Sequence, residues 1–302
     1  MMFKNAILVR AAGRLNPLAL IDGAAGAEFA PCGPTQSRSI GFVPPRGKHH
    51  ALVESIGGQW ILAVRVQTKS VPAAEIKKQL EARLDKVEEL TGRRPRGKAA
   101  RELKEEVILE LLPKAFPKEV TIPVWIDPAD GLVVIGTASW SRADDVITLL
   151  AQVLAGVRLS ALSTAQLADG CMAAWLVEKE APSPFALDRE CELKQPDGEK
   201  AVVRYSRHTL DIDEVGEHIK QGKRPTKVAI THADRVSFVL TDDLVLRKIS
   251  LLDIVFEGGS SEERADAFDA DVAIETGELR QVVSDLIRVL GGEVVPPEQT
   301  QE

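Results

Sequence analysis

Four cationic side chains fall within the eight residues "TGRRPRGK" (91–98), and they are Arg93, Arg94, Arg96 and Lys98. Guanidinium and ammonium groups bind phosphate oxygens, so a cluster of this kind is typical of a contact with a nucleic acid. A solvated charged surface has the same composition, and the cluster alone does not separate the two interpretations. Phosphate binding is the chemistry to test against the rest of the chain.

The charge of the chain is distributed unevenly. The 302 residues have a net charge of −7, yet residues 1–116 carry +7, residues 117–250 carry −4 and residues 251–302 carry −10. Exposed charges act on one another over about 8 to 10 Å in physiological salt, so a positive surface can bind a polyanion although the total is negative. The gradient is compatible with nucleic-acid binding by part of the protein.

Cations also cluster in "RGKHH" (46–50), "RYSRH" (204–208) and "KQGKRPTK" (220–227). The candidate DNA-binding residues in the last two are Arg204, Arg207, His208, Lys223, Arg224 and Lys227. Alternation along a strand would direct Arg204 and His208 to one face and Arg207 to the other. Each cluster taken alone favours an ordinary charged surface, whereas one concave surface that collects them would favour DNA binding.

The kind of DNA binding follows from what the sequence lacks. No helix-turn-helix or zinc-finger pattern offers a recognition helix to the base edges. Aromatic residues, on which unpaired bases stack, make up only 4% of the chain. The remaining mode of binding is contact with the phosphate backbone, which does not read the sequence. Each such contact is weak, so the overall affinity rises if the protein is a dimer or encircles the DNA. Duplex DNA is the expected partner, and single-stranded DNA is left open.

The motifs of common enzymes are absent, because the chain has no GxxxxGK[ST], GxGxxG, GxSxG or HExxH sequence. Two pairs of carboxylates, Asp242 with Asp243 and Asp269 with Asp271, could hold a metal in a nuclease. Aspartate is common at turns and strand starts for backbone reasons, so we expect no metal, no cofactor and no catalysis. The alternatives are a metal-dependent nuclease and a protein-interaction scaffold whose helices grip a partner.

The cysteines Cys32, Cys171 and Cys191 are three in number and far apart, which fits reduced structural thiols. No run approaches the roughly 18 apolar residues of a membrane-spanning helix, and the start "MMFKNAILVR" does not resemble a signal peptide. We therefore expect a cytoplasmic protein that does not bind membranes.

Alternating and helical periodicities predict an α+β fold with mixed sheets and packed helices. In the first half we expect strands at 3–10, at 59–68 and on both sides of the turn "DPADG" (127–131), a helix at 15–29 and a long loop at 31–50. In the second half we expect helices at 169–179, 213–222 and from Leu279, and strands at 201–209, 226–233, 235–242, 244–251 and "DADVAIET" (269–276).

Residues 72–116 differ from their surroundings. Apolar residues recur every three or four positions in a narrow seam, in 76–87 and again in 100–115, between mostly charged residues. Two helices joined by "TGRRPRGK" would form an antiparallel hairpin that projects from the body, because each seam is wide enough only for its partner. The alternative is two helices lying flat on a sheet. The expected domains are a first α+β unit (1–71 and 117–180), the inserted helical finger (72–116) and a second α+β unit (181–302).

Several stretches resemble the RdgC family of bacterial recombination-associated proteins. They follow in order along nearly the whole chain, and they are "FKNAILVR" (3–10), "FAPCGPTQSRSIGFVPP" (29–45), "LLPKAF" (111–116), "VWIDPADGLVVIGTAS" (124–139), "GKRPTKVAI" (222–230) and "FDADVAIETGELRQVVSDLIRVLGGE" (268–293). The second and the last are the most specific. The fingertip "GRRPRGK" departs from the family, so its role is not carried over.

The resemblance implies a two-fold homodimer that closes into a ring, holds DNA non-specifically in a positive central hole, and restrains the recombinase RecA by occupying DNA. It also implies a nucleoid-associated protein without catalytic activity. Phe116 matches the phenylalanine of the family's LLPxAF motif at one subunit contact. Arg207 and His208 align with a pair near the other contact, where lysine and glutamine are expected.

Overall fold

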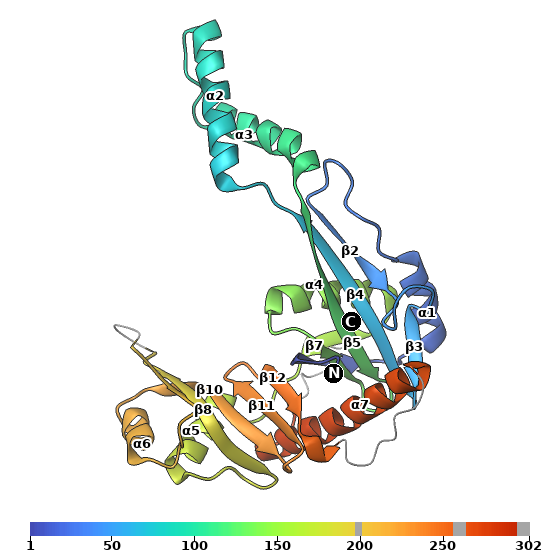
Figure 1. Ribbon diagram of the computed structural model, residues 1–302, viewed down its shortest axis with the longest axis vertical. Coiled ribbons are helices and arrows are strands. Elements are labelled where there is room, and N and C mark those ends of the chain that lie inside the picture. The colour runs from blue at the N-terminus through green and yellow to red at the C-terminus, as the bar shows by residue number, and fades with distance from the viewer. Residues whose placement is uncertain (197–200, 256–263, 295–302) are drawn as a thin grey trace, which may run out of the picture.

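The computed structural model describes residues 1–196, 201–255 and 264–294 (Figure 1). The first half contains β1 (Asn5–Ala12), α1 (Pro17–Gly26), β2 (Arg38–Val43), β3 (Val53–Ile56), β4 (Gln59–Lys69), α2 (Ala73–Thr91), α3 (Lys98–Leu111), β5 (Pro117–Asp127), β6 (Leu132–Ile135), α4 (Trp140–Val153) and β7 (Arg158–Ala161). The second half contains α5 (Ala168–Glu178), β8 (Phe185–Lys194), β9 (Val202–Ser206), α6 (Asp213–Lys220), β10 (Arg224–His232), β11 (Val236–Thr241), β12 (Leu246–Leu251) and α7 (Arg264–Val289).

The strands follow one path in the order β2-β4-β5-β6-β1-β12-β11-β10-β8-β9, with β3 beside β4 and β7 beside β1. We call β1 to β7 the N-terminal sheet and β8 to β12 the C-terminal sheet. The chain is α+β, as predicted, but the paired strands are antiparallel rather than mixed. Antiparallel neighbours need no crossover helix, and the short returns from β5 to β6 and from β10 to β11 illustrate this.

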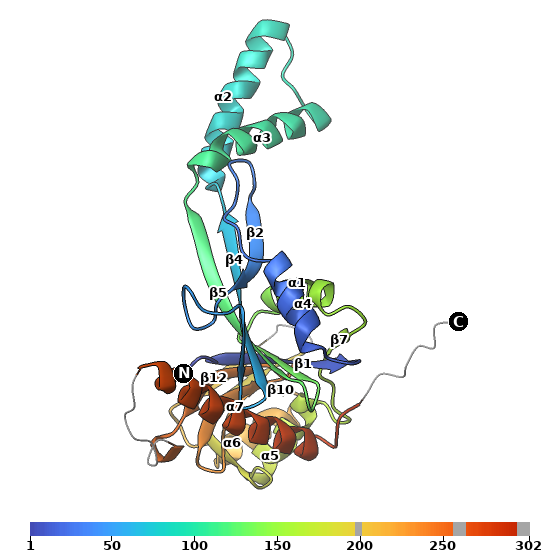
Figure 2. The same ribbon diagram turned by 90° about the vertical axis from the view of Figure 1, so that its right-hand side faces the viewer.

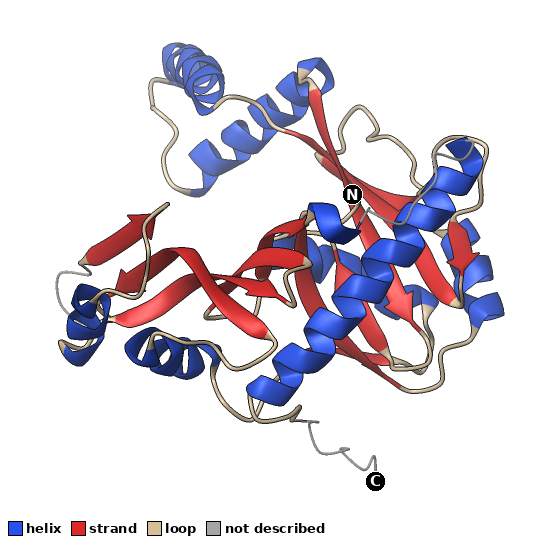
Figure 3. Cartoon of the chain, turned by 60° about the horizontal axis from the view of Figure 1, so that its bottom comes forward, coloured by secondary structure: helices blue, strands red, loops and turns tan. Residues whose placement is uncertain are grey.

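Helices cover both faces of the N-terminal sheet and one face of the C-terminal sheet. Leu20 of α1 and Leu150 of α4 are fully buried in the core of the N-terminal sheet. Met172 of α5, Val215 of α6 and Val282 of α7 are fully buried in a second core, which also includes Leu8 and Trp125 on the other face of the N-terminal sheet. Figure 3 shows the long helix α7 crossing from one sheet to the other. Within the described ranges, no helix combines the length and apolar character needed to cross a bilayer.

Helix α7 is fastened to the N-terminal sheet by buried charges. The Asp127 carboxylate is 1% exposed, and Arg280 Nη2 of α7 lies 2.6 Å from its Oδ2. The second carboxylate oxygen of Asp127 accepts a hydrogen bond from the backbone N–H of Ala129 at 3.1 Å. Glu275 of α7, also buried, accepts hydrogen bonds from the backbone N–H groups of Met2 and Phe3. These contacts join the end of β5 and the start of β1 to one helix.

We expect Arg280→Ala to lower the free energy of unfolding by about 2 to 3 kcal/mol, because it leaves a buried carboxylate without its cationic partner. Urea denaturation followed by circular dichroism measures this loss. Arg280→Lys keeps the charge and should lose less than half as much. An unchanged midpoint for Arg280→Ala would mean that the backbone N–H groups alone satisfy Asp127.

The segment 72–116 forms a helical arm, which we define as α2, α3 and the turn between them. Figures 1 and 2 show the arm extending from the ends of β4 and β5, away from both sheets. The two helices meet at an open angle in both views, and the side-by-side antiparallel hairpin is not seen. Within the two helices only Leu84 and Val107 are buried. Ion pairs from Arg83 to Glu106 and Glu110 supplement this small apolar contact.

Two expectations about secondary structure were wrong. Residues 269–276 belong to α7 rather than to a strand, because Val272 continues the buried face that runs through Leu279, Val282 and Leu286 at helical spacing. The expected loop 31–50 contains β2, which pairs with β4 along its length. Strands β3, β7 and β8 were not predicted at all.

In the structure α2 begins at Ala73 and β5 begins at Pro117, and the helical finger at 72–116 stays a prediction as a domain. The division of the rest into two units at residue 180 stays a prediction, because β1 pairs with β6 of one sheet and with β12 of the other.

Candidate nucleic-acid interface

The C-terminal sheet leaves one face without helices. Alternation along β8 and β10 directs Cys191 and Val228 into the helix-covered core and directs Glu192 and Lys227 to the opposite side. Figure 1 shows α5 and α6 below the sheet, and its other side turned towards the concave space under the arm. We call this side the open face. Its two adjoining hollows are lined by the polar residues Asn5, Asp188, Arg189, Glu190, Glu192, Arg204, Ser206, Arg207, Lys227, Ser237, Arg247 and Lys248.

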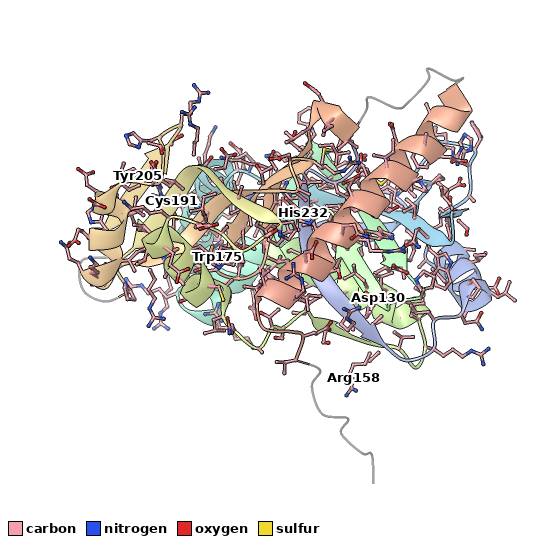
Figure 4. The ribbon with its side chains drawn as sticks, turned by 90° about the horizontal axis from the view of Figure 1, so that it is seen from below. Asp130, Arg158, Trp175, Cys191, Tyr205 and His232 are labelled. Atoms are coloured by element: carbon pink, nitrogen blue, oxygen red, sulfur yellow. The ribbon has the colours of Figure 1, made fainter. Side chains whose placement is uncertain are left out.

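The open face has an excess of positive charge. Six cations line the two hollows against three carboxylates. Between them lie the small or apolar side chains of Ala229 and Val239, which are buried and leave the charged groups as the accessible surface. Figure 4 looks onto the covered face instead, where α7 crosses the molecule and Trp175 and His232 are labelled. The positive excess and the helical cover therefore lie on opposite sides of one sheet.

Glu192 lies at the centre of the cations on β8, β9 and β10. Its carboxylate accepts hydrogen bonds from Arg204 Nε at 2.5 Å, from Thr226 Oγ1 at 2.8 Å and from Lys227 Nζ at 2.9 Å. Partial burial raises the pKa of Glu192, but the hydrogen bonds from Arg204, Lys227 and Thr226 outweigh it and lower the pKa to about 2. Glu192 is therefore ionised throughout the physiological pH range.

A second carboxylate, that of Glu190, also pairs with a cation of the open face, at the other hollow. Both oxygens of Glu190 accept hydrogen bonds from Lys248 Nζ at 2.7 Å. Arg207 lines the same hollow, where its backbone has a left-handed φ of 56° and its side chain is exposed. His208 is also exposed, and its Nδ1 lies 2.7 Å from the carbonyl oxygen of Thr209.

The structure brings together only part of the predicted set of DNA-binding residues. Arg204, Arg207 and Lys227 lie on the open face. Lys223 and Arg224 instead line a separate groove beside α5, and Arg224 Nη1 lies 3.2 Å from Asp169 of that helix. Lys223 precedes β10 and Arg224 is its first residue, so closeness in sequence to Lys227 does not place them on the same surface.

Sequence reasoning missed three cations of the open face, Arg189, Arg247 and Lys248. Arg247 and Lys248 lie in β12, a strand that was predicted, and their charge within an otherwise apolar strand was the available signal. Arg189 lies in β8, which was not predicted, so no signal placed it.

At the tip of the arm three of the four cations are exposed to solvent, and the fourth is engaged in ion pairs within the arm. Arg93 and Arg96 are exposed, and the Lys98 side chain is 90% exposed with Glu102 3.8 Å away. Arg94 instead forms ion pairs with Glu81, Asp85 and Glu88 of α2. Gly92 ends α2 with a left-handed φ of 70°, which turns the chain back so that Arg94 reaches these carboxylates. Arg94 therefore supports the helix.

The carboxylate pairs are held apart on different elements. Asp242 and Asp243 lie in the turn from β11 to β12, whereas Asp269 and Asp271 lie in α7. Burial and the neighbouring Asp243 raise the pKa of Asp242, while Asp243 accepts a hydrogen bond from Trp140 Nε1 at 2.8 Å and Asp269 pairs with Arg46. In the described part of the chain, no three or more histidine, cysteine or acidic side chains gather as a metal site would require.

The three cysteines are free thiols. Burial, together with the charge of Glu190, raises the pKa of Cys191 to about 12, and burial also raises the pKa of Cys171. Both thiols are therefore protonated and unreactive at neutral pH, which fits the structural role expected of them.

Phe116 is the most exposed of the large apolar side chains described. It lies between the arm and β5 and is 91% exposed. An aromatic ring that is hardly buried by its own subunit is typical of a contact with another molecule.

Fold and site together define an antiparallel α+β protein with a projecting helical arm and a cation-rich open sheet face. A family model described as "Putative exonuclease, RdgC" matches residues 1–293. A protein from Cupriavidus pinatubonensis named "Recombination-associated protein RdgC" is 39% identical over 297 residues, covering 97% of this chain and 99% of its own. The protein of that name from Dechloromonas aromatica is 39% identical over 272 residues, covering 88% and 89%. The chain belongs to the RdgC family.

Proposed function

We propose that the protein binds DNA without sequence preference through the open face, as a two-fold homodimer that closes into a ring around the duplex. By occupying DNA it limits RecA-mediated recombination, and it does so on the nucleoid in the cytoplasm without catalysis. The printed names of the relatives, which associate them with recombination, support the biological part of this proposal.

The observation that carries the proposal is the cation excess on the open face. Arg204 and Lys248 are 71% and 66% exposed, so their charged groups can reach phosphate oxygens. The surface has no recognition helix, which suits contact with the backbone instead of the bases. Binding of this kind serves any sequence and is sensitive to salt.

The shape of the subunit supports a ring. Figure 1 shows the arm and the C-terminal sheet as two limbs around a concave space, with the open face turned inward. A second copy related by a two-fold axis could close this space through the ends of the two limbs. Phe116 at the base of the arm and Arg207 with His208 at the edge strand β9 offer the two contacts.

The exposed cations at the tip of the arm are proposed to make additional contacts with DNA. Arg93, Arg96 and Lys98 can touch a phosphate backbone or a neighbouring duplex, whereas Arg94 is engaged by α2. Lys223 and Arg224 lie in the groove beside α5, so they contribute to the general field and make no direct contact on the open face.

Competition between unrelated duplexes tests the proposal. Two labelled duplexes of equal length and different sequence should bind with affinities within about threefold, and the logarithm of each affinity should fall linearly with the logarithm of salt concentration, with a slope of about −3 or steeper. Preference for one sequence by a thousandfold over random DNA would refute the proposal. Failure to bind either duplex at low salt would refute it as well.

A metal-dependent nuclease is the second candidate, supported by the word exonuclease in the description of the family model and by the raised pKa of Asp242. Incubation of end-labelled linear duplex with the protein and Mg²⁺ or Mn²⁺ separates the two. Progressive shortening that Asp242→Asn with Asp243→Asn abolishes would establish the nuclease, and intact DNA would exclude it under those conditions.

A further inference from the structure

The contacts of Glu192 have the chemistry of an oxyanion site. A guanidinium, an ammonium and a hydroxyl group, from Arg204, Lys227 and Thr226, converge on one carboxylate at 2.5 to 2.9 Å. Phosphate oxygens take the same donors at the same distances, so a carboxylate and a phosphodiester compete for such a group of donors. The site also lies on the face that carries the excess of cations.

The fold does not require this carboxylate to hold Arg204. Arg204 lies on β9, which pairs only with β8 in the strand order, and its side chain is 71% exposed. An ion pair made by such an exposed side chain contributes roughly 0 to 1 kcal/mol to stability, whereas the pair of Glu192 with Lys227, which are 15% and 33% exposed, contributes more. Glu190 and Lys248 form a further pair on the same face, with Lys248 66% exposed. Negative groups at these positions are therefore better explained by their effect on the anions that the face attracts.

We infer that Glu192 is an internal competitor of DNA phosphate: it occupies the site formed by Arg204, Thr226 and Lys227 in the free protein and is displaced from these donors when the backbone of DNA binds. This inference rests on the proposed function. Its consequence is that each phosphate contact at this site releases a carboxylate as well as solvent cations, so binding is weaker than the number of cations alone would give. Weak contact allows a protein that encloses DNA to move along it.

Measurement of DNA affinity for Glu192→Gln tests the inference. The glutamine keeps the size of the side chain and removes its charge. With a fluorescein-labelled duplex and anisotropy detection, we expect affinity about three- to tenfold higher than that of the wild type at 0.1 M salt, because one repulsive charge next to the phosphate is gone. The slope of log affinity against log salt should become steeper by up to about 0.9, because the net positive charge opposite the phosphate rises by one.

Two further variants serve as controls. Glu178→Gln removes the same charge from an exposed position of α5, in the groove on the other side of the sheet, and should change affinity less than twofold. Glu192→Asp keeps the charge and should bind about as the wild type does. Because the pKa of Glu192 is about 2, the ratio between Glu192→Gln and wild type should be constant from pH 5.5 to pH 8.

The outcomes separate the inference from the function on which it rests. Salt-dependent binding by the wild type with equal or weaker binding by Glu192→Gln would overturn the inference, since Glu192 would then only position the cations. Urea denaturation of Glu192→Gln shows whether weaker binding comes from unfolding, and in that case Glu190→Gln, which removes the carboxylate paired with Lys248 on the same face, tests the same competition by its expected gain in affinity. A wild-type protein that does not bind the duplex would refute the proposed function itself.

Discussion

Replacing Arg189, Arg204 and Lys248 by glutamine should weaken duplex binding by about 100- to 500-fold at 0.1 M salt. Each cation that neutralises one phosphate contributes about 0.9 to the slope of log affinity against log salt, which at 0.1 M salt is a factor of about eight. The slope should therefore become shallower by about 2.7. Anisotropy titrations of one labelled duplex at four or more salt concentrations give both quantities.

The matched control for this variant replaces Arg14, Arg158 and Lys220 by glutamine. These cations are exposed and lie outside the open face, and their replacement removes the same total charge. We expect a loss of less than about fivefold, from the long-range field alone. Equal losses for the two triple variants would mean that net charge, and not the open face, binds the DNA.

Replacing Phe116 by alanine should weaken the homodimer by about 100-fold or more. Truncation of a buried aromatic anchor at an interface commonly costs about 2 to 4 kcal/mol, and two-fold symmetry removes the ring from both subunits. The isolated subunit should keep its stability, because a side chain 91% exposed makes few contacts within its own chain. Analytical ultracentrifugation over a concentration series measures the change.

The DNA affinity of Phe116→Ala should fall together with the dimer, since a ring that does not close loses the avidity of two open faces. Leu18→Ala, which truncates an apolar side chain 69% exposed on α1, is the control and should leave the dimer intact. If Phe116→Ala remained a dimer with unchanged DNA affinity, Phe116 would have no part in assembly.

The sequence predicts the elements whose periodicity is regular over their whole length. The seams at 76–87 and 100–115 indicate α2 and α3, and the alternation in 59–68 indicates β4. The error at 269–276 has a physical cause, because Val272, Ile274 and Thr276 favour strands locally while the buried face that decides the outcome extends to Leu286. The strand propensity of these few residues is outweighed by the tertiary packing of the whole helix.

The candidate site was only partly predictable for a related reason. Arg204 and Lys227 are 23 positions apart in the chain but share the carboxylate of Glu192, whereas Lys223 and Lys227 are near neighbours and lie on different surfaces. The register between β8, β9 and β10 decides which charges meet, and a single sequence does not specify that register when β8 itself is not recognised. The open face, rather than any one cluster in the sequence, is the site.

Retention on circular duplex DNA tests the central claim most directly, because a ring around duplex DNA leaves through a free end but not from a circle. After binding at low salt and transfer to about 0.5 M salt, where backbone contacts are weak, we expect the protein to stay on a nicked circle and to leave the same DNA once a restriction enzyme has made it linear. Blocking both ends of the linear DNA should restore retention. Equal loss from circular and linear DNA would contradict encirclement.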